Sequence, residues 1–162
     1  MVDLIQRRVC AEIEGDFVVF LIGMRVNKPW KFWKWWPVAS AMPRMLIELA
    51  RKPDLGLLHA RTLGGFPGVT VIQYWRSFEA LEAYSKSRDA AHLPAWRAFN
   101  QAVGSNGDVG IWHETFLIRA GAYESVYNNM PAFGLGRAGT LVDAVGVRQA
   151  ARSRVKAAEL AA

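Results

Sequence analysis

The sequence has a single cysteine, Cys10, which excludes a disulfide within the chain and a zinc site built from several cysteines. It also lacks a long apolar run: the longest early one, Phe17 to Met24, is far too short to cross a bilayer. The N-terminus has no signal-type hydrophobic region. Because a reducing compartment fits these absences, we expect a cytoplasmic protein without a transmembrane segment.

Motifs for common cofactors and for nucleic acids are missing too. There is no Rossmann glycine fingerprint and no Walker motif, which argues against tightly bound NAD or ATP. The formal net charge is +6, but from Arg137 onward there are five basic and two acidic residues, so that half of the excess lies in the last 26 residues. The remainder is only mildly basic and carries no nucleic-acid-binding signature. We therefore expect a small-molecule function and no nucleic-acid partner.

What the chain does have is apolar and aromatic material. Its 162 residues suit one domain with a real core, and 52% of them are hydrophobic, with seven tryptophans. The charged fraction, 21%, is slightly low for a soluble monomer. Some apolar surface is therefore expected to face a partner subunit.

The stretch Asp108 to Ile118 is the most informative one and reads as a β-strand. Alternation places His113 on one face and Glu114 on the other, and both faces are largely apolar. A strand that is apolar on both sides is covered on both sides, so we expect these two ionisable side chains in two enclosed spaces. The alternative is that His113 is a hydrogen-bonded structural residue.

Around this strand the patterns predict further elements. We expect strands at residues 9–13, 17–26, 57–63, 69–76 and 122–128, and helices in the stretch containing Met42, Met45, Leu46 and Leu49, from Ser77 to Lys86 and at 94–103. Residues 139–162 are expected to be a C-terminal helix or tail outside a domain at 1–138.

The segment Asn27 to Pro37 holds four of the seven tryptophans and three lysines, and its two prolines predict a loop. Such a segment could favour a membrane surface, single-stranded nucleic acid or an apolar ligand under a lid. Alternatively, its rings pack on the protein's own helices. We favour a lid or rim over an apolar pocket.

The order strand, helix, strand, strand, helix, strand predicts the split β-α-β unit of the ferredoxin-like α+β fold. Its helices cover one face of an antiparallel sheet. The other face is apolar as well, and a second copy of the same sheet would cover it most simply. We therefore predict a homodimer with the architecture of a dimeric α+β barrel.

Several runs resemble one family of poorly characterised bacterial and fungal proteins, those similar to the fumagillin-pathway monooxygenase. The runs are residues 15–30, 71–79, 92–100, 108–115, 127–131 and 133–136, within a region of resemblance at about residues 7–138. The resemblance implies the dimeric α+β barrel superfamily, which includes cofactor-independent monooxygenases, haem-degrading monooxygenases and haem-dependent aldoxime dehydratases. It implies a fold more strongly than a function.

The leading hypothesis is a monooxygenase that acts on an apolar small molecule between the sheet and its helices. If a cofactor is bound, haem is the best candidate: His113 would ligate the iron, and Arg25, Arg76 or Arg97 would receive the propionates. His59 and His92 are rival ligands. The expected pocket residues are aromatic: Trp30, Tyr74, Trp96, Phe99 and Phe116.

Without a cofactor, His113 or Glu114 would deprotonate an electron-rich substrate that itself reacts with oxygen. Trp112, Asn100 and Tyr74 would shape that site. Two other functions stay open: a haem-dependent dehydratase of the aldoxime type, and a non-catalytic dimer that binds a small apolar ligand.

Overall fold

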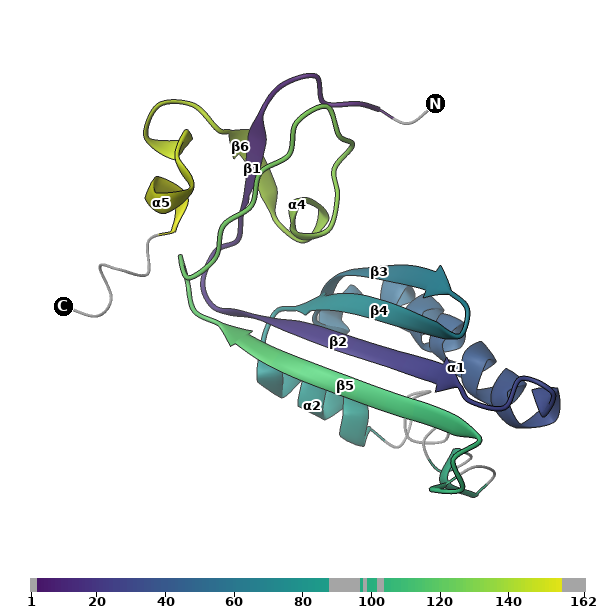
Figure 1. Cartoon of the computed structure of the whole chain (residues 1–162). Coiled ribbons are helices and arrows are strands. Elements are labelled where there is room, and N and C mark those ends of the chain that lie inside the picture. The colour runs from purple at the N-terminus through teal and green to yellow at the C-terminus, as the bar shows by residue number, and fades with distance from the viewer. Residues whose placement is uncertain (1–2, 88–96, 98, 102–103, 156–162) are drawn as a thin grey trace.

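The structure is a computed structural model that describes residues 3–87, 97, 99–101 and 104–155 (Figure 1). Its main sheet has four antiparallel strands in the order β3-β4-β2-β5. These are β2 (Phe17–Val26), β3 (Leu57–Gly65), β4 (Gly68–Trp75) and β5 (Val109–Ile118). Helices α1 (Phe32–Arg51) and α2 (Phe78–Lys86) connect them in the predicted order. The α+β ferredoxin-like fold is confirmed.

Both helices cover the same face of the sheet, here called the helix face (Figure 1). Its core holds the expected stripe of α1, Met45 and Leu49 with Met42, packed on Val18 and Trp75. The helix α2 begins as predicted, because the Ser77 hydroxyl accepts a hydrogen bond from the backbone N–H of Ala80. The space between sheet and helices is thus packed with side chains along this cluster.

The helix α1 begins earlier than predicted. Phe32 to Pro37, expected in a loop, forms its first turns, and Pro37 and Pro43 both lie inside it. A helix tolerates proline best in its first turn, and each of these two prolines removes one backbone hydrogen bond. Packing of Met45 and Leu49 on the sheet outweighs that loss.

The remaining elements form a small lobe, which we define as β1 (Val9–Glu12) together with residues 119–155. There β1 pairs with β6 (Thr140–Asp143), so it lies in a different sheet from β2. The prediction of a helix or tail from residue 139 is therefore wrong at Thr140–Asp143. The strand expected at 122–128 is also wrong, since that segment makes only the isolated bridge of Tyr127 with Val9.

Short helical segments complete the lobe: α4 (Leu135–Ala138), η2 (Gly146–Arg148) and α5 (Ala151–Arg154). One more, η1 (Pro53–Leu55), lies outside the lobe, between α1 and β3. Leu135 packs with Ala11 and with Phe17 of the main sheet. Tyr123 adds an edge-to-face contact with Phe17, with ring centroids 5.1 Å apart. The small lobe therefore covers one end of the sheet's second face (Figure 1), and we call this second face the open face.

Candidate active site

His113 and Glu114 point to opposite faces of β5, as predicted. His113 pairs in register with Ile22 and lies on the helix face, where its ring centroid is 5.6 Å from that of Phe20. Glu114 lies on the open face opposite Leu21. Both residues are exposed, so the enclosure expected for them is not found in the single chain. The catalytic role of His113 stays a prediction.

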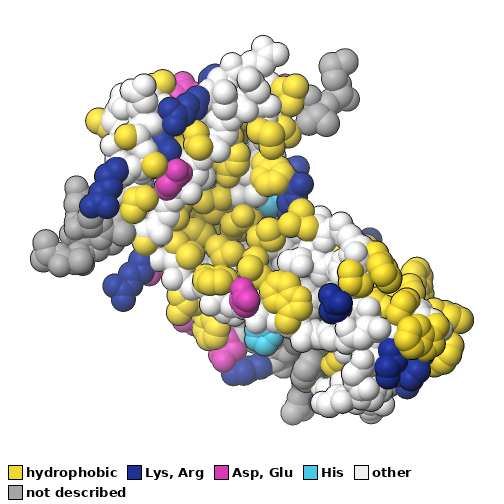
Figure 2. Space-filling view, in the orientation of Figure 1, with side chains coloured by type: hydrophobic (Ala, Val, Ile, Leu, Met, Phe, Trp, Pro, Cys, Tyr) yellow, Lys and Arg dark blue, Asp and Glu magenta, His cyan; other side chains and the backbone are white. Residues whose placement is uncertain are grey.

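The open face gathers more of the predicted residues than the helix face does. The strand register places Trp112, Glu114 and Phe116 of β5 there, beside Leu21 of β2. Tyr74 and Ile72 follow on β4. Figure 2 shows hydrophobic side chains across the middle of this side of the molecule. Phe116 is 45% exposed and Trp112 38%, values that leave large rings open to a ligand or to another chain.

His59 and Tyr74 form the polar corner of this face. They are register partners on β3 and β4, and their rings stack with centroids 6.3 Å apart and planes 14° apart. Burial, helped by the nearby charges of Arg137 and Arg61, lowers the pKa of His59 below its ordinary 6.5. The imidazole is therefore neutral at physiological pH, with a lone pair available for a proton or a metal.

Tyr74 is held by the small lobe. The backbone N–H of Leu135 hydrogen-bonds its hydroxyl, and a Cβ added at Gly134 would lie 3.2 Å from that oxygen. Burial and the neighbouring Tyr127 raise the pKa of Tyr74 above 10.0, although Arg61 and the bond from Leu135 oppose the shift. Tyr74 is thus a neutral phenol that can donate a hydrogen bond.

Arg61 supplies the positive charge of the corner. Its guanidinium carbon lies 3.6 Å from the ring centroid of Phe133, a cation–π contact between β3 and the small lobe. Its Nε is buried and has no hydrogen-bond partner in the part of the chain that the structure describes. Since buried polar groups are nearly always satisfied, this atom is one that a bound acceptor could complete.

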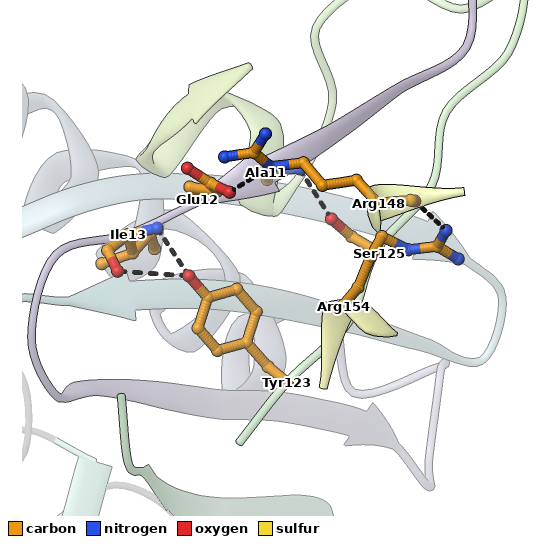
Figure 3. Close-up of polar contacts among 7 residues, drawn as sticks. All are labelled: Ala11, Glu12, Ile13, Tyr123, Ser125, Arg148 and Arg154. Carbon is orange, nitrogen blue, oxygen red and sulfur yellow. Dashed lines mark hydrogen bonds and ion pairs between the residues drawn. The ribbon is translucent and has the colours of Figure 1, made fainter. Parts of the chain in front are cut away.

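A cleft of about 410 Å³ lies inside the small lobe, away from the open face. Its lining includes Glu12, Tyr123, Glu124, Arg148 and Arg154. Most of its polar groups bond to one another (Figure 3): Arg148 donates to Glu12 at 2.7 Å, and the Ser125 hydroxyl accepts from the N–H of Ala11 at 2.9 Å. Arg154 donates to Glu124 at 3.0 Å, and its Nε is the only buried polar side-chain atom of this lining without a partner among the described residues. These contacts tie β1 to residues 119–155. We therefore interpret the cleft as part of the lobe's internal packing.

Cys10 lines the same cleft. The thiol is buried, and burial, with Glu12 adding to it, raises its pKa above 9.0. A protonated, enclosed thiol is a weak nucleophile. The single cysteine is therefore a core residue in this fold.

The other predicted site residues do not meet at one place. Arg25 lies on the open face opposite Gly110, at the end of the sheet away from the small lobe. Arg76 follows β4 and donates to the Pro53 carbonyl at 3.5 Å. Because Arg25 and His113 lie on opposite faces of the sheet, the two cannot serve one ligand within a single chain.

The remaining predictions concern the segment after α2 and the start of α1. Arg97 and Asn100 are exposed, and Phe99 packs on Met24 and Val109 on the helix face. Trp96 and the rival ligand His92 lie outside the described residues, as does part of the helix predicted at 94–103. Trp30 is 68% exposed and lies outside both faces of the sheet, before α1.

Alternation in the strand predicted at 57–63 places His59 and Arg61 on one face, but it gives no link to Phe133 and Arg137. Phe133 lies in a stretch without regular pattern, residues 128–136, and Arg137 follows that stretch directly. The signal was present in the run Phe133-Gly-Leu-Gly136, because its first glycine, Gly134, lets the chain pass close to the hydroxyl of Tyr74. What the sequence cannot give is the folding of the lobe back over β3 and β4.

Comparison with known proteins gives a family and a fold. The model of the family described as "Monooxygenase af470-like" matches residues 17–135. Monooxygenase af470 of Aspergillus fumigatus is 31% identical to the chain over an alignment of 159 residues, and the match covers 85% of this chain and 56% of that protein. The chain therefore spans about half the length of the curated relative it matches.

Two solved structures of aldoxime dehydratases share the fold. One, in complex with butyraldoxime, has a TM-score of 0.66 and 17% identity and covers 84% of this chain and 43% of that one. The other has a TM-score of 0.65 and 17% identity, with 89% and 45% covered. At this identity the likeness extends to the fold alone.

No helix among the described residues is long and apolar enough to cross a bilayer.

Proposed function

The chain belongs to the monooxygenase af470-like family, and from this membership we propose that it is an oxygenase that acts on an apolar small molecule held on the open face of the sheet. The observation that carries the proposal is the pairing of a neutral, half-buried His59 with an apolar aromatic surface on the same face. The proposed substrate site thus differs from the site predicted between the sheet and its helices. The described core on the helix face is filled with side chains.

The floor of the proposed site is apolar and comes from three strands. Leu21, Ile72 and Phe116 would contact the body of the substrate, and Trp112 would bound it towards β5. Small-molecule sites are usually lined in this way, with few polar groups that fix orientation. Here Tyr74 and Arg61 are those groups, and both favour an oxygen atom of the substrate at the His59 end.

His59 is the proposed base. It would take a proton from a carbon next to an electron-rich ring or carbonyl, and Arg61 would stabilise the negative charge left on the substrate oxygen. The carbanion then reduces oxygen. A CH₂ group becomes C=O, one oxygen atom enters the product and the other leaves as water, so the substrate supplies all four electrons and no other reductant is needed.

A haem-dependent version would use the same corner. The neutral imidazole of His59 would hold the haem iron, and Arg61, whose buried Nε has no partner among the described residues, would receive a propionate. His59 and Arg61 thus fit the group better than His113 with Arg25, which lie on opposite faces. Bound haem would supply the means of activating oxygen. Tyr74 would then orient the substrate, and the apolar floor would exclude water.

We further propose that a second copy of the chain closes the site. The open face is only partly covered by the small lobe, and Leu63, Trp112 and Phe116 remain between 38% and 45% exposed. A surface of this kind on a sheet with one helical layer is typical of an interface. Two open faces packed together would enclose Glu114, which the sequence predicts in an enclosed space, together with Phe116.

The test starts from the visible spectrum of the purified protein, produced with an ample haem supply. An intense Soret band that His59→Gln weakens and His113→Gln leaves unchanged would support the haem version. If the protein is colourless, oxygen uptake with electron-rich apolar substrates is measured, with labelled oxygen and product mass reporting one oxygen gained and two hydrogens lost.

His113→Gln is the matched control, because it removes the same side chain from the other face of the sheet. The proposal predicts that His59→Gln abolishes turnover or haem binding while His113→Gln keeps it. The reverse result would assign the chemistry to the helix face. No haem and no oxygen uptake across the substrate panel would leave a non-catalytic binding protein as the better account.

A further inference from the structure

The start of α1 carries a group of exposed aromatic rings that neither the core nor the proposed site uses. Phe32, Trp33 and Trp36 are 63%, 57% and 62% exposed, and Trp30 just before them is 68% exposed. We call these four residues the aromatic patch. Their neighbour Trp35 differs, because it packs with the Val109 cluster and donates to the Pro29 carbonyl at 3.0 Å.

A second segment brings another exposed ring to the same end of the molecule. Phe66, in the turn between β3 and β4, is 82% exposed. That turn lies beside the end of β2, since the N–H of Val26 donates to the Pro67 carbonyl at 2.8 Å, one residue before the chain turns towards α1. Figure 1 shows the β3–β4 turn and the start of α1 at one end of the sheet.

The charge around the patch has one sign. Between Asn27 and Ile47 the sequence has four basic residues and no acidic one. The acidic partner of Lys28 and Lys31 is Asp108, whose side chain is only 4% exposed, beneath the segment, while the two lysines keep 39% and 33% of their side-chain surface. Figure 2 shows basic and hydrophobic side chains together at this end.

The geometry points to the surface of a bilayer that contains anionic lipid as the partner of this end, and we propose that the chain docks there through the aromatic patch. Tryptophan favours the boundary between headgroups and acyl chains, and lysines beside it attract anionic headgroups. Phe66 would enter the same boundary from the neighbouring turn. The docking lies on the surface and needs no spanning helix.

This partner fits better than the alternatives. Lysine is depleted in protein interfaces relative to the rest of the surface, whereas here the partly exposed Lys28 and Lys31 stand among the rings. The patch is also at the end of the sheet rather than on the open face, so a face-to-face dimer leaves it free. Docking of this end on a bilayer is therefore independent of any oxygenase activity on the open face.

The test is co-sedimentation of the full chain with vesicles of phosphatidylcholine alone or mixed with phosphatidylserine. We expect binding to the mixed vesicles, weakened by salt, and at least about a tenfold loss of partitioning in Trp33→Ala/Trp36→Ala. Phe66→Ala should lower binding as well. Because all three side chains are exposed, the melting temperature should stay close to that of the unchanged protein.

Leu117→Ala/Val147→Ala is the matched control, since these side chains are 68% and 79% exposed but lie away from the patch. Equal loss of binding in this control would overturn the proposal, as would vesicle binding that Trp33→Ala/Trp36→Ala leaves unchanged. Light scattering is run in parallel. If the patch variant instead converts a dimer into a monomer, the patch is an interface between copies and the bilayer proposal is wrong.

Discussion

Trp112 lies directly over Gly23 on the open face: a Cβ added at Gly23 would be 2.5 Å from Nε1 of the indole. The two residues are register partners on β5 and β2. Only a residue without a side chain lets the ring lie against the strand at this point. The floor of the proposed site therefore depends on a glycine in the middle of a strand.

Gly23→Ala should displace the Trp112 ring and cost about 1–3 kcal/mol of unfolding free energy, because the added methyl group meets ring atoms below contact distance. Urea unfolding measures the loss, and a changed tryptophan emission should accompany it. Gly64→Ala in β3 is the control, since a Cβ there meets nothing within 4 Å. An alanine at Gly23 that leaves both readouts unchanged would contradict the close packing.

The sequence predicts one half of the Gly23–Trp112 contact and not the other. A glycine inside an apolar strand indicates that something approaches closely, and that much could be predicted for Gly23. What approaches depends on the register between β2 and β5, two segments far apart in the chain. Alternation within one strand predicts the two faces correctly, but it cannot say whether another element covers them.

The same limit explains the two larger errors. Prolines predicted a loop at Phe32 to Pro37, yet tertiary packing of α1 overrides that local preference. Residues 139–162 are predicted to be a helix or tail, whereas Thr140–Asp143 forms a strand with β1, which lies far from it in the sequence. Local patterns predicted the main sheet and its two helices, because the sequences of these elements are strongly periodic. The small lobe is held by contacts that no local pattern encodes.

The proposed dimer predicts that charge on the open face separates the subunits. Phe116→Glu would place a second carboxylate beside Glu114 in the buried interface, so light scattering should change from twice 18.1 kDa to a single chain. Leu117→Glu tests the neighbouring residue, which is 68% exposed on the opposite face of β5, and should leave the dimer intact. Equal effects of both changes would argue against a sheet-to-sheet interface.

The lowered pKa of His59 predicts a pH dependence of stability. The unfolded chain binds a proton below about pH 6.5, while the folded chain resists it until lower pH, so this contribution is complete above 6.5 and lost as pH falls through the folded pKa. Melting temperatures should therefore fall less steeply with acid in His59→Gln than in the unchanged protein. Parallel curves for the two proteins below pH 6.5 would contradict the shift.

The N-cap of α2 gives a prediction independent of the site. Ser77→Ala removes the acceptor for the N–H of Ala80, 3.2 Å away, and should cost about 1 kcal/mol in urea unfolding. Ser77→Thr keeps a hydroxyl at the same place and should retain most of that stability. If Ser77→Ala and Ser77→Thr have the same free energy of unfolding, the hydrogen bond does not stabilise the helix.

Asp108 lies just before β5 and connects that strand to the aromatic patch, because its buried carboxylate binds Lys28 at 2.8 Å and Lys31 at 3.1 Å. Its backbone carbonyl also accepts from the N–H groups of Asn27 and Lys28, so the residue holds the entry to α1 through both main chain and side chain. Hydrogen bonds and charge from the two lysines lower the pKa of this carboxyl below 3.8.

Asp108→Asn should therefore lower the melting temperature at neutral pH, and its difference from the unchanged protein should shrink as pH falls below 3.8. The sign follows from a depressed pKa: the stabilisation is present above 3.8 and lost as pH falls through the folded value. Lys28→Met/Lys31→Met removes the same interaction from the other side, and the combined variant should lose less than the sum of the two. Additive losses would mean that the lysines and Asp108 act separately, and the start of α1 would then be held by its backbone bonds alone.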